Sequence, residues 1–129
     1  MQTLSDKIRA CRDGVVRNPY QGNDKRVVFV CSMGILRSAT AARLYAHKHN
    51  TRAAGTDSDA LVQLSPMLVA WADEIVFVND YNYQKFKHSM DDWDLFNSLN
   101  IRVLDIPDVY EHMHPEMVGE FYKQYEGIN

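Results

Sequence analysis

Short apolar runs alternate with longer segments of mixed polarity along this chain. The clearest run, Val27 to Val30, is continuous and mostly β-branched, which is typical of a parallel strand covered on both faces. The pattern predicts further strands over 52–55, 74–78 and 101–105, and helices over 38–49, about 60–72, 82–99 with a break near Ser89, and 114–126. Strands that alternate with helices predict an α/β fold with a parallel sheet and right-handed crossovers.

The first part of the chain follows a different pattern. Leu4 to Asp13 is predicted to be a short helix whose apolar side carries Leu4, Ile8 and Cys11. A polar stretch from Asn18 to Lys25 then predicts a linker. We therefore expect a helix and linker over residues 1–25, followed by one compact α/β domain over residues 26–129.

Composition and charge narrow the class of protein. The 129 residues suffice for one domain with a core of its own, and the net charge of −3 argues against a basic nucleic-acid-binding face. Two cysteines far apart do not form a secreted disulfide framework. The start of the chain lacks the apolar core of a signal peptide, and no run approaches the ~20 apolar residues of a membrane helix. We expect a cytoplasmic protein that does not enter the membrane.

The segment after the first strand carries the candidate chemistry. Cys31 is followed by five residues, then Arg37, Ser38 and an alanine-rich segment that favours helix, with Ser38 as the expected capping residue. The loop from Ser32 to Leu36 would then lie at a helix N-terminus, where free N–H groups and the helix dipole attract an anion. Arg37 adds a planar fork for two oxygens of a phosphate, and Gly34 allows the loop N–H groups to converge. The same field should favour the thiolate form of Cys31.

The spacing alone is weak evidence, because Cys11 is also followed by five residues and an arginine. No strand precedes Cys11, and Asn18 and Pro19 interrupt any helix after Arg17. Asp13 would also put a carboxylate inside the anion site. We interpret Cys11 as a structural, half-buried side chain and Cys31 as a nucleophile.

Four stretches carry a resemblance to a known family. VCSMGILRSATAARL resembles the phosphate-binding loop and first helix of the low-molecular-weight protein tyrosine phosphatases. AAGT at 53–56, EIVFVND at 74–80 and VLDIPDVY at 103–110 are similar to the later strands of that family and to the loop that bears its general acid. The resemblance implies a three-layer sandwich of the phosphatase I-like kind, with a four-stranded parallel sheet in the order 2-1-3-4 between helices.

The resemblance also implies roles for individual residues. Cys31 would be the nucleophile, Arg37 the phosphate-binding arginine and Asp108 the general acid, with Asp105 as the rival acid. Asp80 would lie near the loop and Tyr110 would form a pocket wall. The remaining phosphate-binding positions would be Ser32, Met33, Gly34, Ile35, Leu36 and Ser38. The implied reaction is hydrolysis of a phosphomonoester through a phosphocysteine, without a metal or another cofactor.

Two alternatives remain open at this point. Arsenate reductases share the fold and the loop, but they need further redox thiols, and only Cys11 remains, outside the part of the chain that carries the resemblance. A catalytically silent phosphate-binding module would keep the same loop. The substrate would be a phosphorylated protein or a small phosphoester, with a phosphorylated RNA end also left open. His112 and His114 are interpreted as part of a polar loop rather than as a metal site.

Overall fold

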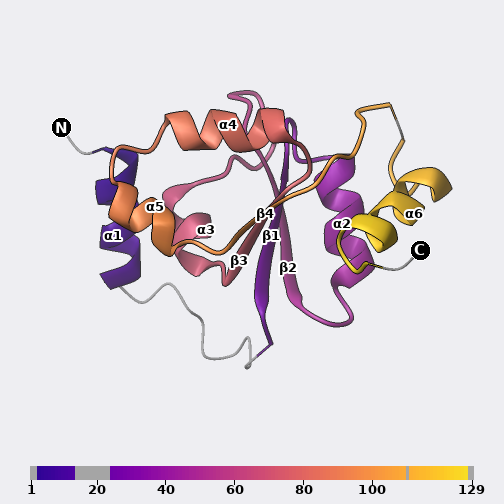
Figure 1. Cartoon of the computed structure of the whole chain (residues 1–129), viewed down its shortest axis with the longest axis horizontal. Helices are drawn as coiled ribbons and strands as arrows, with labels where there is room; N and C mark the ends of the chain where they lie inside the picture. The colour runs from indigo at the N-terminus through magenta and orange to yellow at the C-terminus, as the bar shows by residue number, and fades with distance from the viewer. Residues whose placement is uncertain (1–2, 14–23, 110, 128–129) are drawn as a thin grey trace.

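A four-stranded parallel sheet forms the centre of the protein (Figure 1). The computed structural model describes residues 3–13, 24–109 and 111–127. The strand order is β2-β1-β3-β4. The strands are β1 (Arg26–Cys31), β2 (Asn50–Gly55), β3 (Glu74–Phe77) and β4 (Ile101–Val103). The predicted α/β fold and its strand order are therefore confirmed.

Helices cover both faces of this sheet, which makes the three layers of the predicted sandwich. On one face lie α2 (Arg37–Tyr45) and α6 (Pro115–Gln124). The other face carries α1 (Leu4–Asp13), α3 (Pro66–Trp71), α4 (Asp80–His88) and α5 (Trp93–Ser98).

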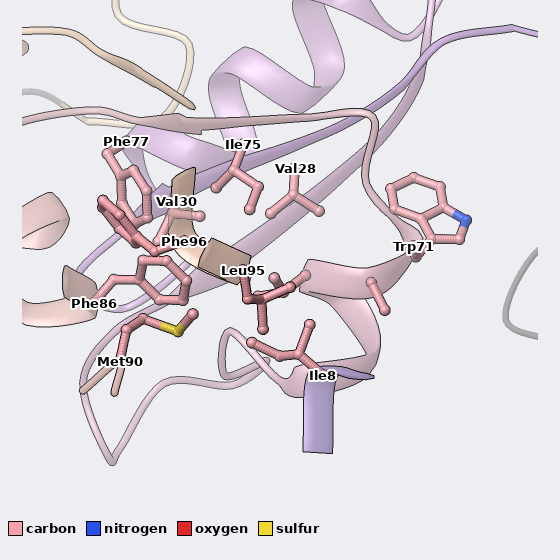
Figure 2. Close-up of a cluster of buried hydrophobic side chains, with 13 residues drawn as sticks. Ile8, Val28, Val30, Trp71, Ile75, Phe77, Phe86, Met90, Leu95 and Phe96 are labelled. Atoms are coloured by element: carbon pink, nitrogen blue, oxygen red, sulfur yellow. The ribbon is translucent and has the colours of Figure 1, made fainter. Parts of the chain in front are cut away.

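The residues of β1 alternate between the two core clusters because successive side chains of a strand point to opposite faces. Val28 and Val30 pack with Ile75 and Phe77 in the first core cluster (Figure 2), which is completed by residues of α1, α3, α4 and α5. Val27, Phe29 and Cys31 belong to the second core cluster, which is completed by residues of β3, α2 and α6 and of the segment after β4. All six residues of β1 are buried, as its continuous apolar pattern predicts.

The N-terminal helix is part of the first core cluster. Ile8 is fully buried there, and Leu4 and Cys11 pack against the cluster from the same helix (Figure 2 labels Ile8). The predicted helix bounds, Leu4 to Asp13, are confirmed. Most of the predicted linker over 18–25 lies outside the described residues, as does Tyr110, for which a pocket wall was expected.

Several helices are shorter than the sequence predicts. The helix expected over 60–72 spans only Pro66–Trp71, because Ser65 caps it through a hydrogen bond from the Leu68 N–H and Pro66 occupies its first turn. The break expected near Ser89 separates α4 from α5. The strand expected over 101–105 ends at Val103. Beyond its end, the Leu104 and Ile106 N–H groups still donate hydrogen bonds to the carbonyl groups of Phe77 and Val78.

Within the described ranges, no helix has the length and apolar character needed to cross a membrane.

His49 lies between α2 and β2, and one of its ring nitrogens is buried in a place that disfavours a positive charge. Its Nδ1 is buried and has no hydrogen-bond partner among the described residues. Burial lowers the pKa of His49 below its ordinary value of 6.5, and the positive charges of Lys25 and Lys48 lower it further. The folded protein therefore holds His49 neutral at a pH where the unfolded chain binds a proton.

This difference predicts that acidification destabilises the fold through His49. Because the pKa is lower in the folded state, the stabilisation is complete above about pH 6.5 and is lost as the pH falls below it. The free energy of unfolding from urea titrations at pH 7.5 and 5.5 should fall less in His49→Gln than in the wild type. Equal losses in the two proteins would show that His49 does not contribute.

Candidate active site

Cys31 ends β1, and its sulfur accepts hydrogen bonds from the loop that follows. The Gly34 N–H donates to Cys31 Sγ at 3.1 Å, and Ser38 Oγ lies at 3.1 Å from the same sulfur. The side chain is buried, with 2% of the residue exposed. Both neighbours are therefore within hydrogen-bond distance of the sulfur, and both carry a proton that they can donate to it.

Ser38 does not cap α2 as the sequence predicted. The helix begins at Arg37 with Leu36 at the capping position, and within the described residues no side chain caps its N-terminus. Ser38 lies instead in the first turn, fully buried, where its hydroxyl meets the Cys31 sulfur. The N–H groups of this turn therefore stay available for an anion.

Two glycines allow the loop to approach the sheet closely. Gly34 has φ of +78°, and a Cβ there would lie 3.0 Å from the carbonyl carbon of Ala54. A Cβ at Gly55, at the end of β2, would overlap the carbonyl oxygen of Ser32. The Thr56 and Asp57 N–H groups donate to the carbonyl groups of Cys31 and Ser32 at 2.9 Å, so the pairing of β1 with β2 continues into the loop.

Arg37 is a buried cation whose described partners are weak for a full charge. Only 3% of its side chain is exposed. Its Nη1 donates to the Ile106 carbonyl at 3.1 Å, and its Nε lies 3.7 Å from Asp108 Oδ1. A buried guanidinium normally needs a close, hydrogen-bonded anion. An oxyanion in the loop would provide one.

The structure distinguishes the two carboxylates that competed for the role of general acid. Asp108 faces Arg37 and lines the cavity above Cys31. Asp105 is held toward α6, because its N–H and carbonyl are both hydrogen-bonded to the Gln124 amide. Of the two, Asp108 is therefore placed beside the sulfur and the arginine.

A small cavity of about 110 Å³ joins these groups. It is lined by Cys31, Ser32, Met33, Ile35, Leu36, Arg37 and Asp108. Sites that enclose a whole small molecule measure roughly 300–1,000 Å³, so this cavity suits one small group at the end of a larger substrate. Met33, Ile35 and Leu36 are each more than one-third exposed and form an apolar rim.

Asn82 supports the loop in the place where Asp80 was expected. Asp80 is exposed, and its Oδ1 accepts a hydrogen bond from Gln84 of the same helix. Asn82 is fully buried, and its Nδ2 donates to Ser32 Oγ at 3.1 Å and to Thr56 Oγ1 at 3.0 Å. The sequence offered a faint signal, since two asparagines flank Asp80 and Tyr81 after β3. Asn79 caps α4, which leaves Asn82 free for another role.

These contacts assemble three distant segments at the carboxyl edge of the sheet, where parallel α/β sheets bind ligands (Figure 1). The loop after β1 supplies the sulfur and N–H groups, α4 supports that loop, and the segment after β4 supplies a carboxylate. In comparisons with known proteins, no family model, no curated protein and no solved structure matches this chain.

Removing the Asn82 amide should loosen the loop. In Asn82→Ala the partly buried hydroxyls of Ser32 and Thr56 lose a shared partner, so we expect the free energy of unfolding to fall by about 1–3 kcal/mol. Vanadate binding, measured by calorimetry, should weaken several-fold. Asp80→Asn, on the same helix, is the matched control and should change stability by less than about 0.5 kcal/mol. Equal behaviour of the two variants would refute a supporting role for Asn82.

Proposed function

We propose that this protein is a phosphomonoester hydrolase that acts through a phosphocysteine intermediate, as the low-molecular-weight protein tyrosine phosphatases do. The observation that carries the proposal is the position of Cys31 Sγ. It accepts the Gly34 N–H, lies against Ser38 Oγ, and borders a small cavity together with Arg37 and Asp108. A stabilised thiolate, an arginine and a carboxylate are the groups that phosphate transfer to a cysteine requires.

In the first step, the phosphate would bind to Arg37 and to the loop N–H groups. The Cys31 thiolate attacks phosphorus, and an S–P bond forms while the P–O bond to the leaving group breaks. The electron pair of that bond leaves with the oxygen, which takes a proton from the carboxylic acid of Asp108. The guanidinium and the helix N-terminus stabilise the charge on the transferring group.

In the second step, water releases the phosphate. The Asp108 carboxylate, now unprotonated, takes a proton from a water molecule whose oxygen attacks phosphorus. The S–P bond breaks, and its electron pair returns to Cys31 as the thiolate. Ser38 and the Gly34 N–H stabilise this leaving thiolate, since both lie 3.1 Å from the sulfur.

The cavity favours an aryl phosphate, such as a phosphotyrosyl residue of a protein, over a polyanionic substrate. Among the cavity-lining residues, Arg37 is the cation, and it faces Asp108. Met33, Ile35 and Leu36 offer apolar surface at the rim. An aromatic ring gains from such surface, whereas a substrate with several phosphates would lack further positive partners there.

The arsenate reductase alternative gains no support from the second thiol. Cys11 packs from α1 against the first core cluster, whereas Cys31 belongs to the second core cluster across the sheet. Arsenite production that depends on added thiol and is lost in Cys11→Ser would nevertheless establish it.

The proposed mechanism predicts the order of activities among four proteins. With p-nitrophenyl phosphate and a chelator present, the wild type should release p-nitrophenol. Cys31→Ser should lose activity by about 10³-fold or more because the nucleophile is gone. Asp108→Asn should lose about 10²-fold because it can neither donate nor accept the proton.

Asp105→Asn is the matched control, since the hydrogen bonds of Asp105 to Gln124 use its backbone. It should retain the wild-type rate. Activity that survives Cys31→Ser would exclude the phosphocysteine mechanism. An inactive wild type that still binds vanadate at the loop would instead identify a silent phosphate-binding module.

A further inference from the structure

The segment that carries Asp108 is fastened to α2 on both sides of the carboxylate. Before Asp108, the Ile106 carbonyl accepts a hydrogen bond from Arg37 Nη1 at 3.1 Å. After it, Thr40 Oγ1 accepts the Met113 N–H at 2.9 Å and lies 3.3 Å from His112 Nδ1. Arg37 and Thr40 are one helical turn apart, so one face of α2 holds both ends of residues 106–113. We call the described residues of this stretch, 106–109 and 111–113, the acid segment. Figure 1 shows the chain after β4 passing the start of α2 on its way to α6.

The hydroxyl group of Thr40 contacts the acid segment. The residue is fully buried. The hydroxyl lies within hydrogen-bond distance of two groups of the acid segment, the Met113 N–H and the His112 ring. When it accepts the Met113 N–H, its own proton is free to bond to an unprotonated His112 Nδ1.

The backbone at this contact is strained. Met113 has φ of +59°, a backbone conformation that residues other than glycine, asparagine and aspartate seldom adopt. Such a residue persists only when its surroundings hold it, and the Met113 N–H is held by Thr40. The hydrogen bond therefore holds the backbone at Met113, near the end of the acid segment.

Asp108 has little side-chain support of its own. Its side chain is 64% exposed, and the ion pair with Arg37 is long, at 3.7 Å. An ion pair at this distance holds an exposed carboxylate only weakly. The position of the carboxylate over the cavity thus depends on the backbone of the acid segment.

We propose that Thr40, together with His112, is a positioning residue for the proton transfer by Asp108. This inference rests on the proposed phosphatase function and goes beyond it, because neither residue touches the phosphate site. The hydroxyl holds the acid segment so that Asp108 reaches the leaving-group oxygen. Removing it should displace the acid while the loop that binds phosphate keeps its structure.

Leaving groups distinguish this role from a general structural one. The value of kcat/KM reports the steps through release of the leaving group. Phenol leaves poorly and needs the proton from Asp108, whereas 2,4-dinitrophenol leaves readily as the anion. A misplaced acid should therefore slow phenyl phosphate hydrolysis selectively, and a damaged phosphate loop should slow both substrates alike.

The test compares Thr40→Val, Thr40→Ser and His112→Ala with the wild type. In Thr40→Val, which keeps the side-chain shape, kcat/KM should fall about 10–100-fold for phenyl phosphate, a part of the ~10²–10⁴ that general acid catalysis supplies. For 2,4-dinitrophenyl phosphate it should change less than about 3-fold, and vanadate affinity should not change. Thr40→Ser should restore the rate, and the exposed His112→Ala should show a smaller loss with the same selectivity.

Equal losses on both substrates, or no loss on either, in Thr40→Val and His112→Ala would overturn the inference. The wild type and Cys31→Ser are measured alongside with phenyl phosphate. An inactive wild type, or activity that survives Cys31→Ser, would overturn the proposed function and this inference with it. A Cys31-dependent wild type with unselective Thr40 variants would overturn the inference alone.

Discussion

The buried guanidinium of Arg37 is the constraint on which the rest of the site depends. It lies at the start of α2, and its hydrogen bond to the Ile106 carbonyl fastens the chain after β4 to the helix after β1. A carbonyl and a carboxylate 3.7 Å away compensate a buried positive charge incompletely. Arg37 therefore joins the segments around it. Its incompletely compensated charge favours binding of an anion where these segments meet.

Buried polar groups at the two edges of the sheet differ in how closely they are paired. At the amino edge, Glu74 accepts the Tyr125 hydroxyl at 2.8 Å and pairs with Lys25 at 3.4 Å. Burial and the neighbouring Glu74 raise the pKa of Tyr125, which keeps it a donor. The Glu74 carboxylate is thus paired with both a hydroxyl and an ammonium group. At the carboxyl edge, the first turn of α2 lacks a side-chain cap among the described residues, and Arg37 lacks a close anion. Among the described residues, the carboxyl edge therefore holds a buried guanidinium whose charge a bound anion would compensate.

Sequence patterns predicted the elements whose residues are close together in the chain. The run Val27–Val30 marked the central strand, and the residues around Cys31 marked a loop between a strand and a helix. The contacts of Asn82 with Ser32 and of Thr40 with Met113 join residues 50 and 73 positions apart, so no local pattern contains them. Ser38 was misassigned for a related reason, because a serine near a helix start suits a cap equally well until the position of the sulfur is known.

The site divides into a rigid part and a part held by few bonds. Gly34 and Gly55 let the loop after β1 pack directly on β2, and Asn82 holds that loop from α4, so small displacements of the loop would meet backbone atoms. The acid segment is held mainly by the hydrogen bonds of Arg37 and Thr40, with Asp108 itself exposed. In the proposed mechanism, phosphate binding and proton transfer would therefore depend on separate contacts. A substitution of Thr40 would then change the position of Asp108 without changing the loop after β1. Substrates with different leaving groups would distinguish these two effects.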